Sequence, residues 1–205
     1  MPGQDALSAE QNAEFFARDK HGRDAAELDT YRLIREAITR EVAGTERLLD
    51  VGNGGEFEYD TAQVGEIVAV DLFLDELPDS HFPDNVTPRR GDALALDEPR
   101  GSFDVVLEAL LYHHLVGSRP DDSLHNIRSA VAEAARVLRP GGRLVVAESC
   151  VPRWFYGFER AMFRPLTALA KTPVLGGHPA VLQLPIALLC QLVAESLPIE
   201  RAYPI

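Results

Sequence analysis

Apolar residues recur along this chain with two different periods. In residues 28–42 they return every three to four positions, the spacing of one helix face, and Gly44 follows as a stop. Farther upstream, Ser8 and Gln11 have the spacing of a helix-capping box, and two phenylalanines follow them. The pattern therefore predicts two helices within residues 1–45.

From residue 46 the apolar residues come in short continuous runs, which are typical of strands buried on both faces of a parallel sheet. Residues 85–89 are a weaker candidate, because Pro88 suits an edge strand. A helical stripe fills residues 124–138 and ends at the Pro-Gly-Gly of residues 140–142. Strands separated by helical segments predict a doubly wound, Rossmann-like α/β fold with a mostly parallel sheet. The strongest runs are residues 47–51, 66–70, 103–107 and 143–147.

We expect a single domain over residues 1–205, capped by the helices of residues 1–45. The sheet core covers residues 46–150, an apolar lid and helix follow over residues 151–198, and a sixth strand lies at residues 199–205.

The lid segment has four interpretations that the sequence leaves open. Phe155, Phe158 and Met162 lie at helical spacing, which suits a cover over a binding site, ordinary core, a dimer face or a membrane-docking surface. Four cations give this segment the local positive charge that would favour docking on a membrane: Arg153, Arg160, Arg164 and Lys171.

Composition narrows the class of protein. The 205 residues include 20 cations and 32 acids, a net charge of −12, which argues against a nucleic-acid partner. Two cysteines are too few for a disulfide framework, and the first residues lack an apolar leader segment. No apolar run reaches the roughly 20 residues that span a bilayer. These features predict a cytoplasmic protein without stable membrane insertion.

The most informative segment is a glycine turn after the first strand, at residues 48–55. Glycines there let a ligand approach the backbone, and the following amides point toward it. Dinucleotide binding calls for a third glycine where this chain has Phe57, and Asp50 and Glu56 would repel a pyrophosphate. The same carboxylates attract an ammonium and a sulfonium. Charge therefore favours S-adenosylmethionine (SAM) over a nicotinamide dinucleotide.

Further acids follow the next three strands. Asp71 can accept both hydroxyl protons of a ribose, Asp92 can accept from an adenine amino group, and Glu108 ends the fourth strand near the expected methionine portion. The expected cofactor-binding residues are Asp50, Gly52, Asn53, Gly54, Asp71, Leu72, Gly91, Asp92, Ala93 and Glu108.

The ordered motifs resemble those of class I SAM-dependent methyltransferases, in the small-molecule group with His-His-Leu after strand four. The resemblance covers residues 46–150 and implies a sheet in the order 3-2-1-4-5-7-6, SAM as cofactor and S-adenosylhomocysteine as product. The motifs are Leu49-Asp50-Val51-Gly52-x-Gly54, Val70-Asp71, Gly91-Asp92-Ala93, the run at residues 103–107, His113-His114-Leu115 and the segment at residues 136–142.

Three departures from the family pattern change the expectation. Glu56 stands where the family usually has a glycine. The separation of Asp50 and Asp71 along the chain is about two residues shorter than is usual in the family, so the first crossover helix should be short or irregular. The chain ends where the last hairpin should begin, so either strand seven is absent or the sheet is completed differently. An exposed sheet edge would favour pairing with a second copy in a homodimer.

The expected catalytic residues are His113, His114 and Glu148, which follow strands four and five. Histidine suits the removal of a proton from an acceptor, and Glu148 can orient an imidazole or act as the base. Related O-methyltransferases imply the same roles. Adjacent histidines have diverging side chains, which disfavours a metal site, and Cys150 is expected to be a buried structural thiol.

Together these features predict a SAM-dependent methyltransferase for a small-molecule acceptor, most simply an oxygen nucleophile of a natural product, sugar or lipid-like compound. Two alternatives remain: a SAM-binding protein without catalysis, and an NAD-dependent enzyme on the same type of sheet.

Overall fold

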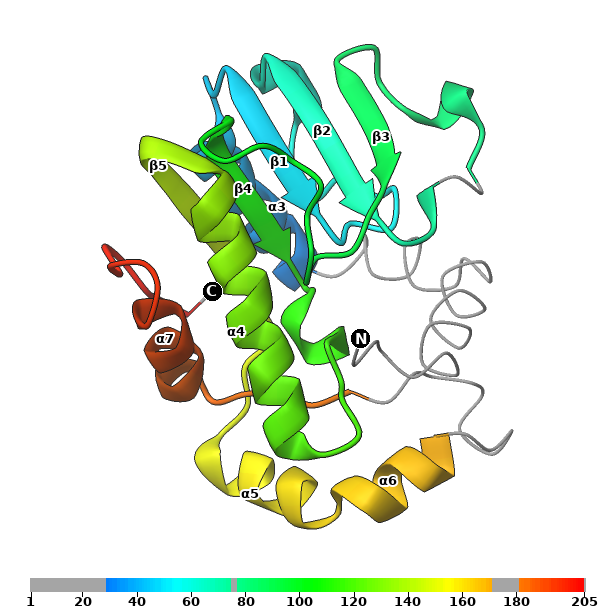
Figure 1. The fold of residues 1–205 in the computed structure, drawn as a ribbon, viewed down its shortest axis with the longest axis vertical. Coiled ribbons are helices and arrows are strands. Elements are labelled where there is room, and N and C mark those ends of the chain that lie inside the picture. The colour runs from blue at the N-terminus through cyan, green and yellow to red at the C-terminus, as the bar shows by residue number, and fades with distance from the viewer. Residues whose placement is uncertain (1–28, 75–76, 171–180, 205) are drawn as a thin grey trace. The chain divides into compact units, whose positions relative to one another are not determined.

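A computed structural model describes residues 29–74, 77–170 and 181–204 (Figure 1). The chain forms two compact units. The sheet unit contains the described residues up to Leu111, together with Ala130–Ala147 and residues 203–204. The helical unit contains Tyr112–Ser129 and the described residues from Glu148 to Ala202. The helix expected near residues 8–16 lies outside the described residues.

The sheet unit is built on five parallel strands in the order β3-β2-β1-β4-β5, which confirms the predicted order of the first five strands. Pro88 lies in the edge strand, as predicted, where its missing amide does not interrupt a second ladder. The strands are β1 (Arg47–Val51), β2 (Glu66–Asp71), β3 (Val86–Arg90), β4 (Phe103–Ala109) and β5 (Leu138–Ala147).

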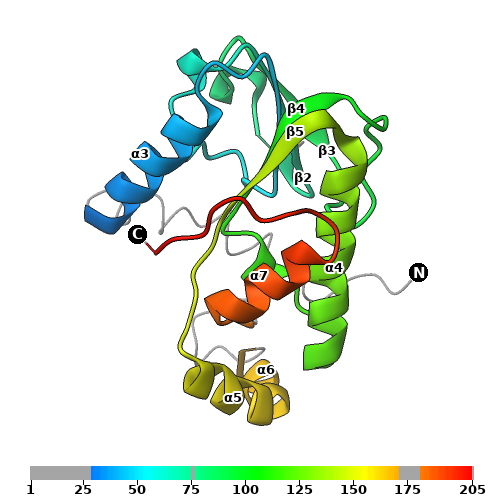
Figure 2. The same ribbon diagram turned by 90° about the vertical axis from the view of Figure 1, so that its left-hand side faces the viewer.

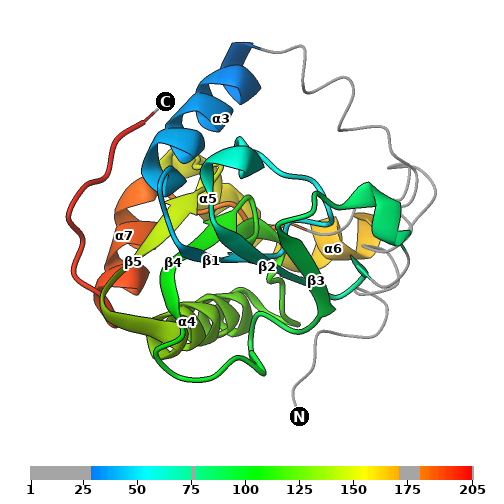
Figure 3. The ribbon, with the colours of Figure 1, turned by 90° about the horizontal axis from the view of Figure 1, so that it is seen from above.

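Helices cover both faces of this sheet. Helix α3 (Asp29–Val42) lies on one face, and the part of α4 (Pro120–Val137) that belongs to the sheet unit lies on the other (Figure 3). The apolar stripe of α3 is the reason that it packs there, because Ile38 and Val42 are buried against Leu48 and Ile67. The doubly wound fold and this helix are thus confirmed.

The connection from β1 to β2 contains no α-helix. Residues 56–65 make only the short 3₁₀ turn η1 (Thr61–Gln63), in which the side chain of Asp60 accepts from the amide of Ala62. The described part of the next connection likewise contains no α-helix, and it includes the 3₁₀ turn η3 (Asp79–His81). The expectation of an irregular first crossover is confirmed.

Two expected element boundaries are wrong. β5 begins at Leu138 rather than at residue 143, because the Pro-Gly-Gly segment forms a bulge. Phe103 of β4 pairs with Leu138, and Val105 pairs with Arg143. Residues 199–204 contain no strand: prolines flank this segment, and its described side chains are exposed without a neighbouring strand.

The helical unit contains η4 (Tyr112–His114), the first part of α4, and helices α5 (Arg153–Ala161), α6 (Phe163–Ala170) and α7 (Ile186–Ala194). Figure 2 shows α7 beside the first part of α4, where Arg128 and Glu195 form an ion pair of 2.8 Å. The interpretation of Phe158 and Met162 as core is wrong, because both side chains are exposed. Within the described ranges, every helix is too short or too polar to cross a bilayer.

Replacement of Gly65 by alanine should destabilise the protein. A Cβ atom there would lie 2.6 Å from the backbone oxygen of Glu46, which is itself held by the amide of Glu66. We expect the free energy of unfolding, measured by urea denaturation, to fall by about 1–3 kcal/mol. Gly157→Ala is the matched control: it faces open space in α5 and should be neutral or stabilising by up to about 1 kcal/mol. Equal effects of the two substitutions would contradict the prediction.

Candidate functional site

Parallel register brings the acids of three strands to one edge of the sheet. Val51 of β1 pairs with Val70 on one side and with Glu108 on the other, and Asp71 pairs with Arg90 of β3. The carboxyl ends of the strands therefore lie next to one another, which is where open α/β sheets bind ligands. The segments that follow β1, β2 and β3 all leave from this edge.

Asp50 is fully buried, as is Glu108. Its Oδ2 accepts hydrogen bonds from Asn53 Nδ2 (2.8 Å) and from the hydroxyl of Tyr59 (2.9 Å). Its Oδ1 is buried and makes no hydrogen bond within the described part of the chain. Burial raises the pKa of Asp50 to about 7, although the two hydrogen bonds oppose this shift. Oδ1 of Asp50 is therefore an acceptor without a donor in the described part of the chain, and a cationic donor would satisfy it.

Tyr59 was not among the expected site residues. It is fully buried, and its pKa is raised by burial and by the Asp50 carboxylate that it contacts. Because it lies in an irregular loop, no motif or periodicity in the sequence indicates that it contacts Asp50.

The glycine turn has the backbone conformation that its composition predicts. Gly52 and Gly54 have φ angles of +77° and +59°, which L side chains rarely adopt. The amide of Gly52 donates to the carbonyl of Val70 (2.7 Å), which ties the turn to β2. Asn53 spans the turn, since its Oδ1 accepts from the amide of Gly55 while its amide group binds Asp50.

Asp71 ends β2 and holds the glycine turn from the other side. Its Oδ2 accepts from the amide of Gly54 (3.0 Å), and its Oδ1 accepts from the amide of Phe73 (3.1 Å). Burial raises the pKa of Asp71, and these backbone hydrogen bonds oppose the shift. Each carboxylate oxygen retains a second lone pair, so both can still accept from the hydroxyls of a ribose. The neighbouring Leu72 is half-buried.

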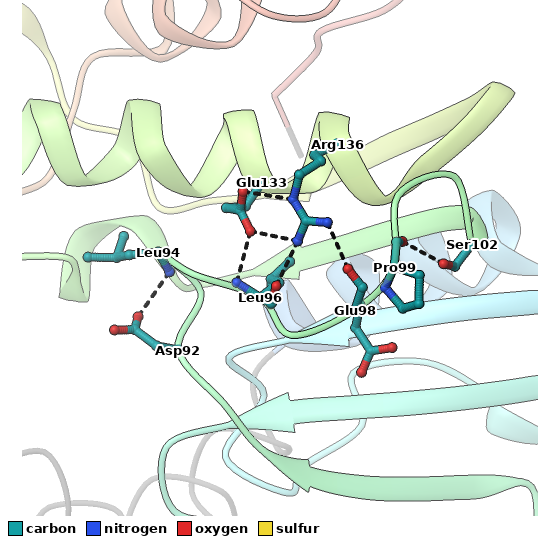
Figure 4. A network of polar contacts seen from close by, with 8 residues as sticks. All are labelled: Asp92, Leu94, Leu96, Glu98, Pro99, Ser102, Glu133 and Arg136. Atoms are coloured by element: carbon teal, nitrogen blue, oxygen red, sulfur yellow. Dashed lines mark hydrogen bonds and ion pairs between the residues drawn. The ribbon is translucent and has the colours of Figure 1, made fainter.

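The loop after β3 presents Asp92, and a partly buried network of polar contacts holds this loop in place (Figure 4). Asp92 Oδ1 accepts from the amide of Leu94 (2.9 Å), and Ala93 is buried. Arg136 donates to the carbonyls of Leu96 and Glu98, both at 2.7 Å. Gly91 leaves no room for a side chain, because a Cβ atom there would meet Val70.

Glu133 completes this network on α4. It forms a two-pronged ion pair with Arg136, and its Oε2 also accepts from the amide of Leu96 (2.9 Å). The Arg136 guanidinium holds the pKa of Glu133 below its usual range. The motif at residues 136–142 does not by itself indicate that Arg136 or Glu133 fixes the Asp92 loop.

Glu108 lies within β4, one residue before its end, and its side chain is buried. The prediction that Glu108 ends the fourth strand is therefore wrong by one residue, because Ala109 is the last residue of β4.

His113 and Glu148 are in direct contact in the helical unit. His113 Nδ1 donates to Glu148 Oε1 at 2.7 Å, and both side chains are largely shielded from solvent. Glu148 also accepts from the amide of Tyr112 (2.7 Å) and from its neighbour Ser149 (2.7 Å). Because the carboxylate binds Nδ1, the hydrogen-bond geometry leaves Nε2 of His113 as the proton acceptor.

The expectation that the adjacent histidines diverge is wrong. The rings of His113 and His114, both in the 3₁₀ turn η4, lie at 4.1 Å between centroids. The expectation that Cys150 is buried is also wrong, since it lies in an exposed extended segment that forms a bridge with Leu184. Among the described residues, no group of three or more potential metal ligands converges.

A parallel sheet in this order, with acids and a glycine turn at its carboxyl edge, defines a Rossmann-like protein built to hold a nucleoside ligand. Residues 49–146 match the family described as a methyltransferase domain. The chain has the fold of the class I SAM-dependent methyltransferases, and residues 49–146 belong to that methyltransferase-domain family.

Several known proteins with similar sequences or folds are methyltransferases. The chain is 36% identical over 163 residues to the demethylmenaquinone methyltransferase of Beutenbergia cavernae, which covers 72% of this chain and 61% of that protein. It is 34% identical over 139 residues to the 27-O-demethylrifamycin SV methyltransferase of Amycolatopsis mediterranei. That match covers 58% of this chain and 48% of the relative. The chain thus spans between about half and three-fifths of the length of these two relatives.

The fold is similar to that of the N-methyltransferase NodS from Bradyrhizobium japonicum, solved in complex with S-adenosyl-L-homocysteine. The TM-score is 0.54 at 15% identity, and the match covers 90% of this chain and 84% of NodS. At that identity the similarity establishes the shared fold.

The raised pKa of Asp50 should make stability depend on pH. The folded state keeps a proton that the unfolded chain releases above pH 3.8, so the free energy of unfolding should fall as the pH rises toward about 7. Asp50→Asn retains an acceptor for Tyr59 but cannot titrate. Across this range we expect wild-type protein to lose up to about 4 kcal/mol relative to the variant. Urea denaturation at several pH values measures this difference, and parallel curves for the two proteins would contradict it.

Arg136→Ala should loosen the loop that carries Asp92. Because the guanidinium holds two loop carbonyls and Glu133, we expect a loss of about 2–3 kcal/mol in the free energy of unfolding. Amide hydrogen exchange should become faster at Leu96. Arg128→Ala is the control, because its pair with Glu195 is half-exposed and should contribute less than about 1 kcal/mol. Unchanged exchange at Leu96 would rule out the positioning role of Arg136.

Proposed function

We propose that this chain methylates an oxygen of a small-molecule acceptor, with SAM as methyl donor and His113 as general base. The observation that carries this proposal is the 2.7 Å contact between His113 Nδ1 and Glu148 Oε1. A histidine held by a carboxylate in this way is suited to taking a proton from a hydroxyl group.

The sheet unit supplies the residues that would hold the cofactor. SAM carries an ammonium and a sulfonium, and Asp50 offers a buried carboxylate oxygen that lacks a partner in the described chain. A pyrophosphate would meet that same carboxylate and Asp71, which argues against the NAD alternative. The proposed cofactor-binding residues are Asp50, Gly52, Asn53, Gly54, Asp71, Leu72, Gly91, Asp92, Ala93 and Glu108.

When bound, SAM supplies a methyl group already activated on sulfur, so the protein has to align the acceptor and remove its proton. His113 Nε2 takes the acceptor's hydroxyl proton. Glu148 keeps the Nδ1–H tautomer and stabilises the imidazolium that forms, while the amides of Tyr112 and Ser149 fix its position. His114 lies against the His113 ring and is the second candidate for the base.

The class of acceptor is proposed from two relatives. Their names identify demethylmenaquinone and 27-O-demethylrifamycin SV as what they methylate, and both are small molecules. We propose an acceptor of this size and kind, a hydroxyl-bearing organic compound, with residues 151–198 as its cover.

Removal of the base should abolish turnover without loss of cofactor binding. We expect His113→Ala to lower kcat by about 10²- to 10⁴-fold, measured as S-adenosylhomocysteine release with a panel of phenolic and quinol acceptors. Glu148→Gln, which keeps the shape but not the charge, should lower kcat in the same direction, and His114→Ala tests the other histidine. SAM affinity, measured by calorimetry, should stay unchanged in all three variants.

His125→Ala is the matched control, because His125 is an exposed histidine on α4 that should not affect turnover. Wild-type turnover in the His113 variant would refute the assignment of the base. SAM binding without turnover of any acceptor would favour the alternative of a cofactor-binding protein without catalysis.

A further inference from the structure

Helices α5 and α6 expose an apolar surface that the proposed chemistry does not use. Trp154, Phe158, Met162 and Leu166 recur every four residues, and all four are exposed, Trp154 by 74%. We call these four residues, together with Arg153 and Arg164, the α5–α6 face. Single exposed apolar residues are common on proteins, but a stripe of four large ones indicates a binding surface.

The composition of this surface is unusual in a second respect. Among residues 153–166 and 168, every exposed residue is apolar, glycine or arginine. No hydroxyl, amide or carboxylate side chain is exposed among these residues. Helices with aromatic and aliphatic residues beside arginines are typical of proteins that lie in the interface of a membrane.

The opposite side of α5 and α6 anchors them within the helical unit. Glu159 is buried and accepts from the amide of Gln183 (3.3 Å), and Phe163 is buried as well. Arg160 is held by Asp121 on α4 at 2.8 Å. The exposed stripe is therefore held outward by contacts on its inner side, so it is a persistent surface of the fold.

Charge identifies the kind of partner. The chain as a whole carries a net charge of −12, yet residues 153–170 contain three arginines and a single acid, Glu159. Arg160 is paired with Asp121 on the inner side, so Arg153 and Arg164 are the cations of this face. Burial of Glu159 raises the pKa of its carboxyl, which reduces even that negative charge. This face is thus locally cationic on an anionic protein, and an anionic surface would bind it in one orientation.

We propose that the α5–α6 face docks on an anionic lipid bilayer, with Trp154, Phe158 and Leu166 entering the headgroup region and the arginines contacting lipid phosphates. A second copy of the chain is a poorer occupant, because pairing two such faces would bring arginines against arginines. The two helices are 9 and 8 residues long, so they can lie in the interface but cannot span it.

The test uses the single tryptophan of the chain as its probe. Trp154 fluorescence is recorded while the full chain is titrated with phosphatidylglycerol vesicles or with phosphatidylcholine vesicles. We expect a blue shift with the anionic vesicles, little change with the neutral ones, and reversal by high salt. Lipids brominated on the acyl chains should quench Trp154, because quenching requires the ring to enter the bilayer.

Two variants keep the probe and remove the proposed contacts. Phe158→Glu combined with Leu166→Glu should weaken vesicle binding by about tenfold or more, and Arg153→Gln combined with Arg164→Gln by a similar factor. All these side chains are exposed, so far-UV circular dichroism should show an unchanged fold. Leu33→Glu, at an exposed leucine on α3, is the matched control and should bind as wild type does.

Several outcomes would overturn the proposal. One is the absence of a blue shift and of quenching with anionic vesicles, and another is undiminished binding by the glutamate variant. A wild-type dimer that Phe158→Glu dissociates would assign the face to self-association instead. Because binding is measured without SAM or acceptor, failure here leaves the proposed methyl transfer untouched, and failure of turnover leaves this proposal untouched.

Discussion

The parallel pairing of β1 with β2 and β4 is the constraint on which the candidate cofactor site depends. Each of these strands ends at the same edge, so the residues that follow them converge whatever their separation along the chain. The acids therefore share a small region in which water is scarce. Burial then raises the pKa of both Asp50 and Asp71, and repulsion from Asp71 adds to the shift of Asp50.

This arrangement costs stability, and the local structure offsets only part of the cost. Tyr59 and Asn53 satisfy one oxygen of Asp50, and backbone amides bind Asp71, but the second oxygen of Asp50 makes no hydrogen bond in the described chain. A site with unbalanced negative charge binds a cationic nucleoside more readily than a phosphorylated one. The carboxylate oxygen of Asp50 that makes no hydrogen bond therefore both lowers the stability of the fold and accounts for the proposed selectivity for SAM.

The helical unit follows a different electrostatic principle. Here the Glu148 carboxylate accepts hydrogen bonds from an imidazole and from backbone amides. Its charge therefore has partners, in contrast to that of Asp50, and its position is fixed. On α5 and α6 the charge is reversed, with arginines beside exposed apolar side chains. One acidic chain thus contains two regions of opposite character, each suited to a ligand of opposite charge.

The sequence by itself determined the strands and the strand-end acids, because each of these depends on local periodicity or on a residue's place after a strand. The order of the strands came from the resemblance to the class I SAM-dependent methyltransferases. It also predicted the irregular first crossover, since the segment after the glycine turn is a poor helix former. It misplaced the start of β5 and the last strand, where pairing with a neighbour decides whether an extended segment becomes a strand.

Only the tertiary structure decided which side chains meet. The contacts of Tyr59 with Asp50, of Arg136 with the Asp92 loop and of His113 with Glu148 join residues 9 to about 40 positions apart. The hydrophobic pattern of the sequence likewise does not predict the exposure of Trp154 and Phe158. An apolar helical stripe has the same spacing whether it faces a core or the solvent. Periodicity specifies a face of a helix, and only packing specifies what that face contacts.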